Sequence, residues 1–108
     1  MSNLSPRQFK EYTLKFKPAP VDDDMANHRI IAQHNNRRVG KMEWDIGTGD
    51  IQNVEVHPKH QRKGLATAMW HYAQDISGNN VGHSPVRTDE GDAWAHSVGG
   101  DIPERSRD

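Results

Sequence analysis

The sequence predicts an α/β (α+β) fold, with a mixed, mainly antiparallel sheet of about five strands and two main helices. Short segments in which apolar and polar residues alternate fill the first half of the chain, and turn-forming residues separate them. An apolar stripe with helical spacing follows, and a second helix signal lies near the C-terminus. Because 108 residues leave no room for a second core, we expect residues 1–108 to form a single domain.

The first strand is predicted around Tyr12, Leu14 and Phe16, which alternate with polar residues. Prolines shortly after Phe16 should end it, because proline lacks the N–H that a sheet requires. A second strand is predicted from His28 to His34. The intervening segment from Val21 to Asn27 is short and acidic, so we expect a loop or one helical turn there.

A hairpin is predicted next, because Asn35-Asn36 can adopt the positive φ angles of a tight turn. Beyond this turn, the apolar positions from Gly40 to Ile46 alternate with charged ones, which is typical of a strand with one buried face. The segment from Gly47 to Asp50 is the next predicted turn.

The segment from Ile51 to His57 is strongly strand-like, but its apolar residues change face. Ile51 would lie on one face of a regular strand, whereas Val54 and Val56 would lie on the other. The alternation therefore breaks near Gln52. Such a break is typical either of a β-bulge or of a strand that is buried on both faces.

Two helices are predicted in the second half of the chain. The apolar stripe of the first consists of Leu65, Met69, Tyr72, Ala73 and Ile76. Gly78 is placed to end this helix as a C-terminal cap. The second helix should begin after Thr88, which suits an N-cap, and close at Gly99-Gly100. A weak strand from Val81 to Arg87 is expected between the helices, and residues 101–108 should form a polar tail.

The composition excludes several classes of function. The chain has no cysteine, which excludes disulfides, thiolate metal sites and a covalent cysteine intermediate. A formal net charge of -1 argues against a nucleic-acid partner. No apolar run approaches the roughly 18–20 residues of a membrane span, and no secretory signal opens the chain, so we expect a cytoplasmic protein without a membrane partner. The apolar content of 32% predicts a thin core, which a partner subunit could complete.

The segment from Val54 to Thr67 carries the most chemical information and has the pattern of a strand, a short basic loop and a helix start. A helix N-terminus presents unpaired N–H groups and a partial positive charge, so it attracts anions. Arg62 and Lys63 add full charges, and Gly64 lets the backbone approach a bulky diphosphate. The two cations also fit a solvated loop, but the flanking pattern favours a phosphate cradle.

Within this segment, Gln61-Arg62-Lys63-Gly64-Leu65-Ala66 fits the Gln/Arg-x-x-Gly-x-Gly/Ala signature of the GNAT superfamily of acyl-CoA-dependent N-acyltransferases. The preceding Val54-x-Val56-x-Pro58 also matches, and the chain resembles the family from about Val39 to Gly100. The resemblance implies that acetyl-CoA binds through this loop, with its pantetheine arm paired to the preceding strand. The cofactor-binding residues that it implies are Val54, Val56, Gln61, Arg62, Lys63, Gly64, Leu65, Ala66 and Thr67.

The resemblance also implies a reaction, the transfer of an acetyl group from acetyl-CoA to an amine. A backbone N–H near Val56 would polarise the thioester carbonyl. Glu55 or His57 would act as the catalytic base, either directly or through a water molecule. Glu55 also fits an ordinary exposed strand residue.

The chain departs from the family in two respects. The family often places a tyrosine, as general acid, four residues before the closing glycine of the last helix, where this chain has Ala95. The neighbouring His96 or Ser97 could substitute for it, although the helix periodicity directs them elsewhere. The connection from Val21 to Asn27 is too short for the two helices that normally wall the acceptor site. An open site suits a large or protein-borne amine, or completion of the sheet in a homodimer.

A catalytically silent protein, which uses the fold or a bound acyl-CoA for protein interaction, is the alternative to an enzyme. Seven histidines raise the question of a zinc site, but their spacings match no compact arrangement. Ser84, Arg87 and Thr88 lie where the last predicted strand meets the last helix, near the place of the cofactor in the family. We expect them to add polar contacts to it.

Overall fold

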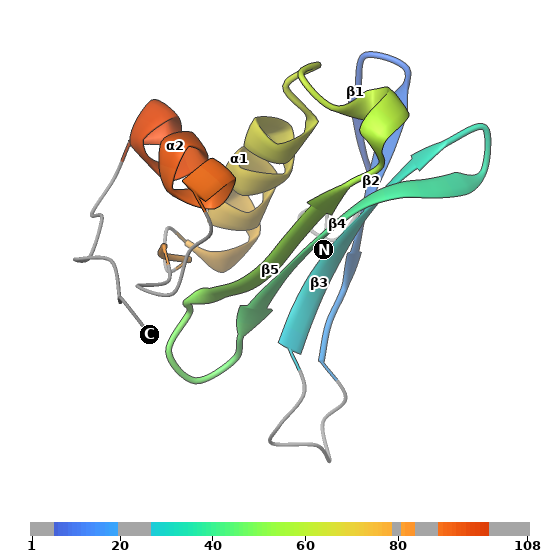
Figure 1. The fold of residues 1–108 in the computed structure, drawn as a ribbon. Coiled ribbons are helices and arrows are strands. Elements are labelled where there is room, and N and C mark those ends of the chain that lie inside the picture. The colour runs from blue at the N-terminus through green and yellow to red at the C-terminus, as the bar shows by residue number, and fades with distance from the viewer. Residues whose placement is uncertain (1–5, 20–26, 79–80, 84–88, 100–108) are drawn as a thin grey trace.

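A computed structural model of the chain describes residues 6–19, 27–78, 81–83 and 89–99. One sheet of five antiparallel strands, in the order β1-β2-β3-β4-β5, forms its centre, and the two helices follow the sheet in the chain (Figure 1). The elements are β1 (Arg7–Phe9), β2 (Tyr12–Lys17), β3 (Asn27–His34), β4 (Arg37–Asp45), β5 (Ile51–Val56), the 3-10 turn η2 (Pro58–His60), α1 (Leu65–Ser77) and α2 (Asp89–Val98).

The strand β1 is one that alternation does not predict. It has three residues with a single apolar side chain, Phe9, so it carries no measurable period. It pairs with β2 across a tight turn in which Lys10 has a φ of 53°. The strand forms because the neighbouring hairpin strand offers a ladder of backbone partners, an interaction that the sequence pattern does not display.

The hairpin between β3 and β4 confirms the predicted turn. Asn35 and Asn36 have φ angles of 52° and 65°, the left-handed conformation that a two-residue hairpin turn needs. Asparagine tolerates this conformation better than most residues because its short side chain can bond locally. Ile46, however, lies beyond the end of β4 and is 43% exposed, so the predicted alternation stops one position earlier.

Asp45 ends β4 and shapes the turn that leads to β5. Its Oδ1 accepts hydrogen bonds from the backbone N–H groups of Gly47 and Thr48, at 2.7 and 2.9 Å. The hydrogen bonds from Thr48 and Gly47 lower the pKa of Asp45, because they favour its charged form. This turn places Gly49 and Asp50 where the start of β5 must meet a later segment of the chain.

A β-bulge at Gln52 is the correct alternative for the phase break in β5. Trp44 pairs with Ile51, whereas Glu43 pairs with Asn53, so Gln52 has no partner on β4. An inserted residue of this kind shifts the alternation of the strand by one position. Ile51 can therefore face the core on the same side of the sheet as Val54 and Val56.

The core lies on one face of the sheet, beneath α1. Val54 and Val56 pair with Met42 and Gly40, and paired residues of an antiparallel ladder share a face. Both valines pack against the core cluster. The predicted helix stripe is confirmed, since Leu65, Met69, Tyr72 and Ala73 are buried, and Trp70 joins them although the stripe does not include it. Gly78 caps α1 in the left-handed conformation, as predicted.

The strand predicted from Val81 to Arg87 is replaced, in its described part, by a single parallel bridge between Asp50 and Gly82. The N–H of Ile51 donates to the Gly82 carbonyl, and the N–H of Gly82 donates to the Gly49 carbonyl, both at 2.9 Å. This bridge is the parallel component of the fold within the described residues, because all strand pairs of the sheet are antiparallel. Residues 84–87 lie outside the described part.

The second helix, α2, is confirmed from Asp89 to Val98. Gly99 has a φ of 79°, and its N–H donates to the Ala95 carbonyl at 3.0 Å, which closes the helix as predicted. The expectations for residues 21–26, Thr88 and the tail 101–108 fall outside the described residues. No helix in the described part of the chain is long and apolar enough to cross a membrane.

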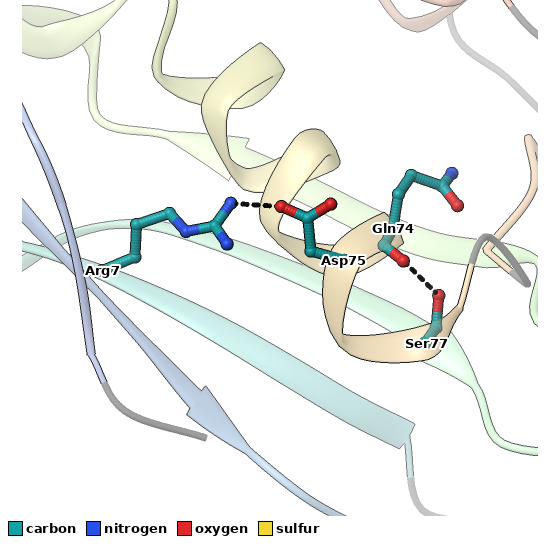
Figure 2. Close-up of polar contacts among 4 residues, drawn as sticks. All are labelled: Arg7, Gln74, Asp75 and Ser77. Carbon is teal, nitrogen blue, oxygen red and sulfur yellow. Dashed lines mark hydrogen bonds and ion pairs between the residues drawn. The ribbon is translucent and has the colours of Figure 1, made fainter. Parts of the chain in front are cut away.

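An ion pair fastens the N-terminal strand β1 to the outer side of α1. The guanidinium of Arg7 lies 2.7 Å from the carboxylate of Asp75 (Figure 2). It also lies 4.7 Å from the centre of the Tyr72 ring. Figure 2 also shows Ser77 donating to the Gln74 carbonyl at the end of the helix. Both charged side chains of the pair are largely exposed, so it stabilises the fold by about 1 kcal/mol at most.

The close approach of α1 to the sheet generates a prediction about Gly40. A Cβ at this position would lie 3.2 Å from the Glu55 carbonyl oxygen and 3.4 Å from both Ala32 and Leu65. We expect Gly40→Val to lower the free energy of unfolding by about 1–3 kcal/mol, because the core has no room for the side chain. Urea denaturation measures this loss.

The matched control is Gly82→Val, since a Cβ at Gly82 would have 3.8 Å to its nearest neighbour and no positive φ opposes it. The control should be clearly less destabilised. Equal losses in the two variants would show that α1 does not pack against Gly40.

Candidate functional site

The candidate site begins where β5 ends. The strand stops at Val56, so the prediction that it extends to His57 is wrong. His57 is instead the N-cap of η2, and its Nδ1 accepts a hydrogen bond from the Lys59 N–H at 3.2 Å. Proline at the next position favours this short turn, because its fixed φ suits the start of a helix. His57 and Glu55 consequently do not project as neighbours from one regular strand.

The register of β4 and β5 fixes where the backbone groups of β5 point. The N–H of His57 donates to the Val39 carbonyl at 2.8 Å. The pair Gly40 and Val56, which lies between these residues, is therefore a non-hydrogen-bonded pair of the ladder. In such a pair the N–H and C=O of Val56 point away from β4, and those of Val54 do the same, because the pattern repeats every second residue.

β5 is an edge strand, and its outer edge is open beyond Ile51 in the described part of the chain. The side-chain amide of Gln61 donates to the outward carbonyl of Val56 at 2.9 Å. This bond folds the loop back on the strand end and leaves the Val56 N–H facing outward. The edge thus offers an extended chain backbone partners of the kind that a sheet strand provides.

The first turn of α1 presents backbone N–H groups without a cap. Gly64 is the N-cap residue with a φ of 82°, no side chain caps the helix, and no acidic residue lies in its first turn. Ala68 is the residue whose N–H bonds back to the Gly64 carbonyl, at 2.9 Å. The N–H groups of Leu65, Ala66 and Thr67 precede that bond and have no partner among the described residues, so they can bind an anion, with the partial positive charge of the helix behind them.

Two cations flank these amides. Arg62 and Lys63 are both exposed, and neither takes part in an ion pair within the described residues. Arg62 adopts a φ of 63°, a strained conformation for a residue with a side chain. A Cβ at Gly64 would meet only the Phe9 ring, at 3.6 Å, so the space above the loop is open to a ligand.

The N-terminal hairpin holds the loop in place. Lys10 donates from its Nζ to the Lys63 carbonyl at 3.0 Å. The hydroxyl of Tyr12 lies 2.9 Å from Nδ1 of His60, and the Tyr12 side chain is fully buried. These contacts join residues about fifty positions apart in the chain. Sequence reasoning missed them because no local pattern links β1 and β2 with the loop.

Glu55 lies on the face of the sheet opposite α1. Its partner across the ladder is Lys41, whose ammonium lies 3.5 Å from the Glu55 carboxylate and 3.2 Å from that of Glu43. The Glu55 side chain is 59% exposed, which leaves it accessible to solvent and to a substrate. It is thus paired with a cation but not enclosed by one.

The helix α2 carries no hydroxyl where the family often has its general acid. Ala95 occupies this position and is buried. The exposed Ser97 donates a hydrogen bond from its hydroxyl to the Trp94 carbonyl at 2.7 Å, so the hydroxyl proton is directed into the helix and not toward a substrate. His96 is exposed on the side away from the buried Ala95.

An aromatic stack braces the other side of α1. The rings of Trp70 and His83 are parallel with centres 4.4 Å apart, and Trp94 meets both edge-on. Trp94 donates from Nε1 to the hydroxyl of Thr67 at 3.2 Å. The Thr67 side chain therefore fixes α2 against the first turn of α1, while His83 donates from Nε2 to the Gly99 carbonyl at 2.9 Å.

A cavity of about 640 Å³ lies at the opposite end of α1. The helix has 13 residues, so its two ends are about 20 Å apart, and the cavity cannot hold a group bound to the uncapped amides. No group of histidine and acidic residues in the described ranges could hold a metal ion. The cavity is lined by Phe16, Pro18, His28, Trp44, Asp45, Ile46, Gly47, Thr48, Gly49, Ile76 and Ser77.

Comparison with known proteins agrees with this geometry. The chain matches the acetyltransferase (GNAT) family over residues 2–96, and it belongs to that family, whose members transfer acyl groups. Searches of curated proteins and of solved structures returned no significant match. Ser84, Arg87 and Thr88, which sequence reasoning placed near the cofactor, lie outside the described residues.

The positive φ of Arg62 generates a prediction that separates its backbone from its side chain. Arg62→Gly should be more stable than Arg62→Ala by about 1 kcal/mol, because glycine adopts the left-handed conformation without strain whereas alanine does not. Thermal or urea unfolding of the two variants measures the difference. If both variants have the same stability, the loop does not hold this conformation in solution.

Proposed function

We propose that the protein transfers an acetyl group from acetyl-CoA to an amine. The observation that carries this proposal is the meeting of two sets of open backbone groups. The uncapped amides of Leu65, Ala66 and Thr67 lie at one end of the loop, and the outward edge of β5 at Val54 and Val56 lies at the other.

The residues present fit the parts of acetyl-CoA. The diphosphate would accept hydrogen bonds from the first turn of α1, with Arg62 and Lys63 adding charge and Gly64 leaving space. The amide groups of the pantetheine arm would pair with the outer edge at Val54 and at the carbonyl of Val56, as an added strand does, which leaves the Val56 N–H for the thioester. Gln61 and Thr67 would hold the loop and the helix start through their bonds to Val56 and Trp94.

The reaction forms a carbon–nitrogen bond and breaks the carbon–sulfur bond of the thioester. Negative charge develops on the thioester oxygen, and the outward N–H of Val56 would stabilise this charge by donating a hydrogen bond to the oxygen. The attacking amine must lose a proton, which Glu55 or His57 would take, directly or through water. The thiolate would then be protonated from solvent, because the described part of α2 offers no tyrosine.

The proposed acceptor is a large or protein-borne amine. The face of the sheet that carries Glu55 is half-exposed, and no described helix covers it. An amine presented on a second macromolecule could reach this face without entering a narrow pocket.

A catalytically silent acyl-CoA binder is the second candidate, and one observation favours it. Ala95 stands at the usual general-acid position and is buried, so no side chain there can protonate the thiolate. Such a protein would retain the phosphate loop and the open strand edge while contributing little to the chemical step.

Binding is tested by Gly64→Glu, which puts bulk and negative charge in the loop. We expect acetyl-CoA binding to fall at least about 100-fold in titration calorimetry, because the carboxylate occupies the place of the diphosphate and repels it. The matched control is Gly78→Glu at the other end of α1. That residue also has a positive φ and nothing within 4 Å of a Cβ, so it carries the same backbone strain.

Retained binding in the control and loss in Gly64→Glu would support the proposal. Equal binding by both variants, or no binding by the unaltered protein, would refute it.

Turnover is tested by the release of free CoA thiol with a panel of small amines, lysine peptides and proteins. We expect turnover with at least one macromolecular acceptor. Replacing the true base, by Glu55→Gln or His57→Gln, should lower kcat by about 100-fold or more while acetyl-CoA binding persists. Binding without thiol release across the whole panel would instead establish the silent candidate.

A further inference from the structure

Three imidazoles gather beside the loop Gln61–Ala66, and two of them, those of His34 and His60, have no role in the acyl transfer proposed above. The centre of the His60 ring lies 5.2 Å from that of His34 and 6.0 Å from that of His57. His57 is the N-cap of η2 and His60 is its last residue, directly before Gln61, whereas His34 comes from the end of β3. We call these three residues the histidine cluster.

Tyr12 anchors the histidine cluster to the sheet. Its ring centre lies 5.6 Å from that of His34 and 5.5 Å from that of His60, and its hydroxyl meets Nδ1 of His60 at 2.9 Å. A buried tyrosine hydroxyl needs a hydrogen-bond partner, and a hydroxyl can either donate to Nδ1 or accept from it. The contact therefore survives when His60 gains a proton, and the cluster stays in place in both charge states.

Partial burial, together with the neighbouring charges, disfavours the protonation of His60 in the free protein. Its partial burial is the largest effect that lowers the pKa of His60, and His34, Lys63 and His57 lower it further. Glu11, in the turn between β1 and β2, acts in the opposite direction and raises the pKa. The Glu11 carboxylate also lies 3.5 Å from Nε2 of His34. The groups that face His60 thus come from the hairpin turn, β2, β3, η2 and the loop.

We propose that the histidine cluster is a proton-linked part of the anion site, in which His60 takes up a proton when a polyphosphate ligand binds the loop Gln61–Ala66. The proposal rests on the proposed function, because it assumes that the diphosphate of acetyl-CoA lies at this loop. It adds a specific class of interaction, an imidazolium that helps to neutralise the ligand phosphates, and it assigns Tyr12 as the residue that positions it.

The direction of the effect follows from linkage. An anion near His60 favours the charged imidazolium and therefore raises the pKa of His60 in the complex. A ligand that raises a pKa binds with proton uptake, so its affinity increases as the pH falls through the pKa of the complex toward that of the free protein. The gain lies between the pKa of His60 in the free protein, which is below its ordinary value, and the higher pKa of His60 in the complex.

Titration calorimetry with acetyl-CoA tests this inference. Measurements at one pH in buffers of low and high ionisation enthalpy give the number of protons taken up on binding. We expect net uptake near pH 6.5, and an affinity that rises at least about threefold between pH 8 and pH 6. The ligand's own phosphomonoester also takes up a proton in this pH range, since its second pKa is about 6, and it contributes to both the proton uptake and the pH dependence of the affinity. The share that belongs to His60 is therefore obtained by comparison with variants.

The informative variant is His60→Asn, because the asparagine amide can keep the hydrogen bond to Tyr12 but cannot take up a proton. It should lose most of the proton uptake and flatten the pH dependence, with a smaller effect on affinity near pH 8. The control is His71→Asn, since His71 is exposed on α1 and belongs to no ring contact of the cluster. That variant should keep the uptake of the unaltered protein.

A second measurement follows His60 directly and uses the unaltered protein. The imidazole signals of His60 in a nuclear magnetic resonance pH titration should shift to a higher midpoint when acetyl-CoA is added. Binding with equal proton uptake in His60→Asn, or an unmoved His60 midpoint, would overturn this inference and leave the proposed function intact. Absence of acetyl-CoA binding at every pH would overturn both.

Discussion

The candidate site depends on backbone N–H groups that have no partner in the part of the chain that the structure describes. A helix normally satisfies its first amides with a capping side chain, but Gly64 has none, and its positive φ turns the chain sharply into α1. The outward N–H of Val56 ends an edge strand at the same loop. These groups face water in the free protein, and an anionic or amide-rich ligand can replace that water. The remaining structure serves to hold them in one orientation.

Two supports from distant parts of the chain provide that orientation. The N-terminal hairpin contacts the loop through Lys10 and Tyr12, and the stack of Trp70, His83 and Trp94 holds α2 against α1. The loop therefore lies between two braced surfaces although its own residues are exposed. The proposed phosphate site would need this rigidity, because ordering a mobile loop on binding would consume part of the interaction free energy.

The described residues provide fewer side chains suited to the proton transfers of acyl transfer than to the binding of an acyl-CoA. Membership of the acetyltransferase family makes acyl transfer the expected reaction class. Glu55 is accessible but paired with Lys41, and Ala95 replaces a general acid with a buried methyl group. A chain of this kind can bind an acyl-CoA firmly and still depend on solvent, or on the acceptor itself, for proton transfer.

Local chemistry determined much of this protein from sequence alone. The turn at Asn35-Asn36, the break in alternation near Gln52 and the loop before α1 follow from φ preferences, alternation and the charges of neighbouring residues, which act over a few positions. The register of β5 on β4 then decided that the break is a β-bulge and not a strand buried on both faces. Only the tertiary structure decided that β1 joins the sheet, that His57 leaves the strand, and that Tyr12 reaches the loop. Those outcomes depend on backbone ladders and side-chain contacts between segments far apart in the chain, and such contacts leave no periodic trace in a sequence.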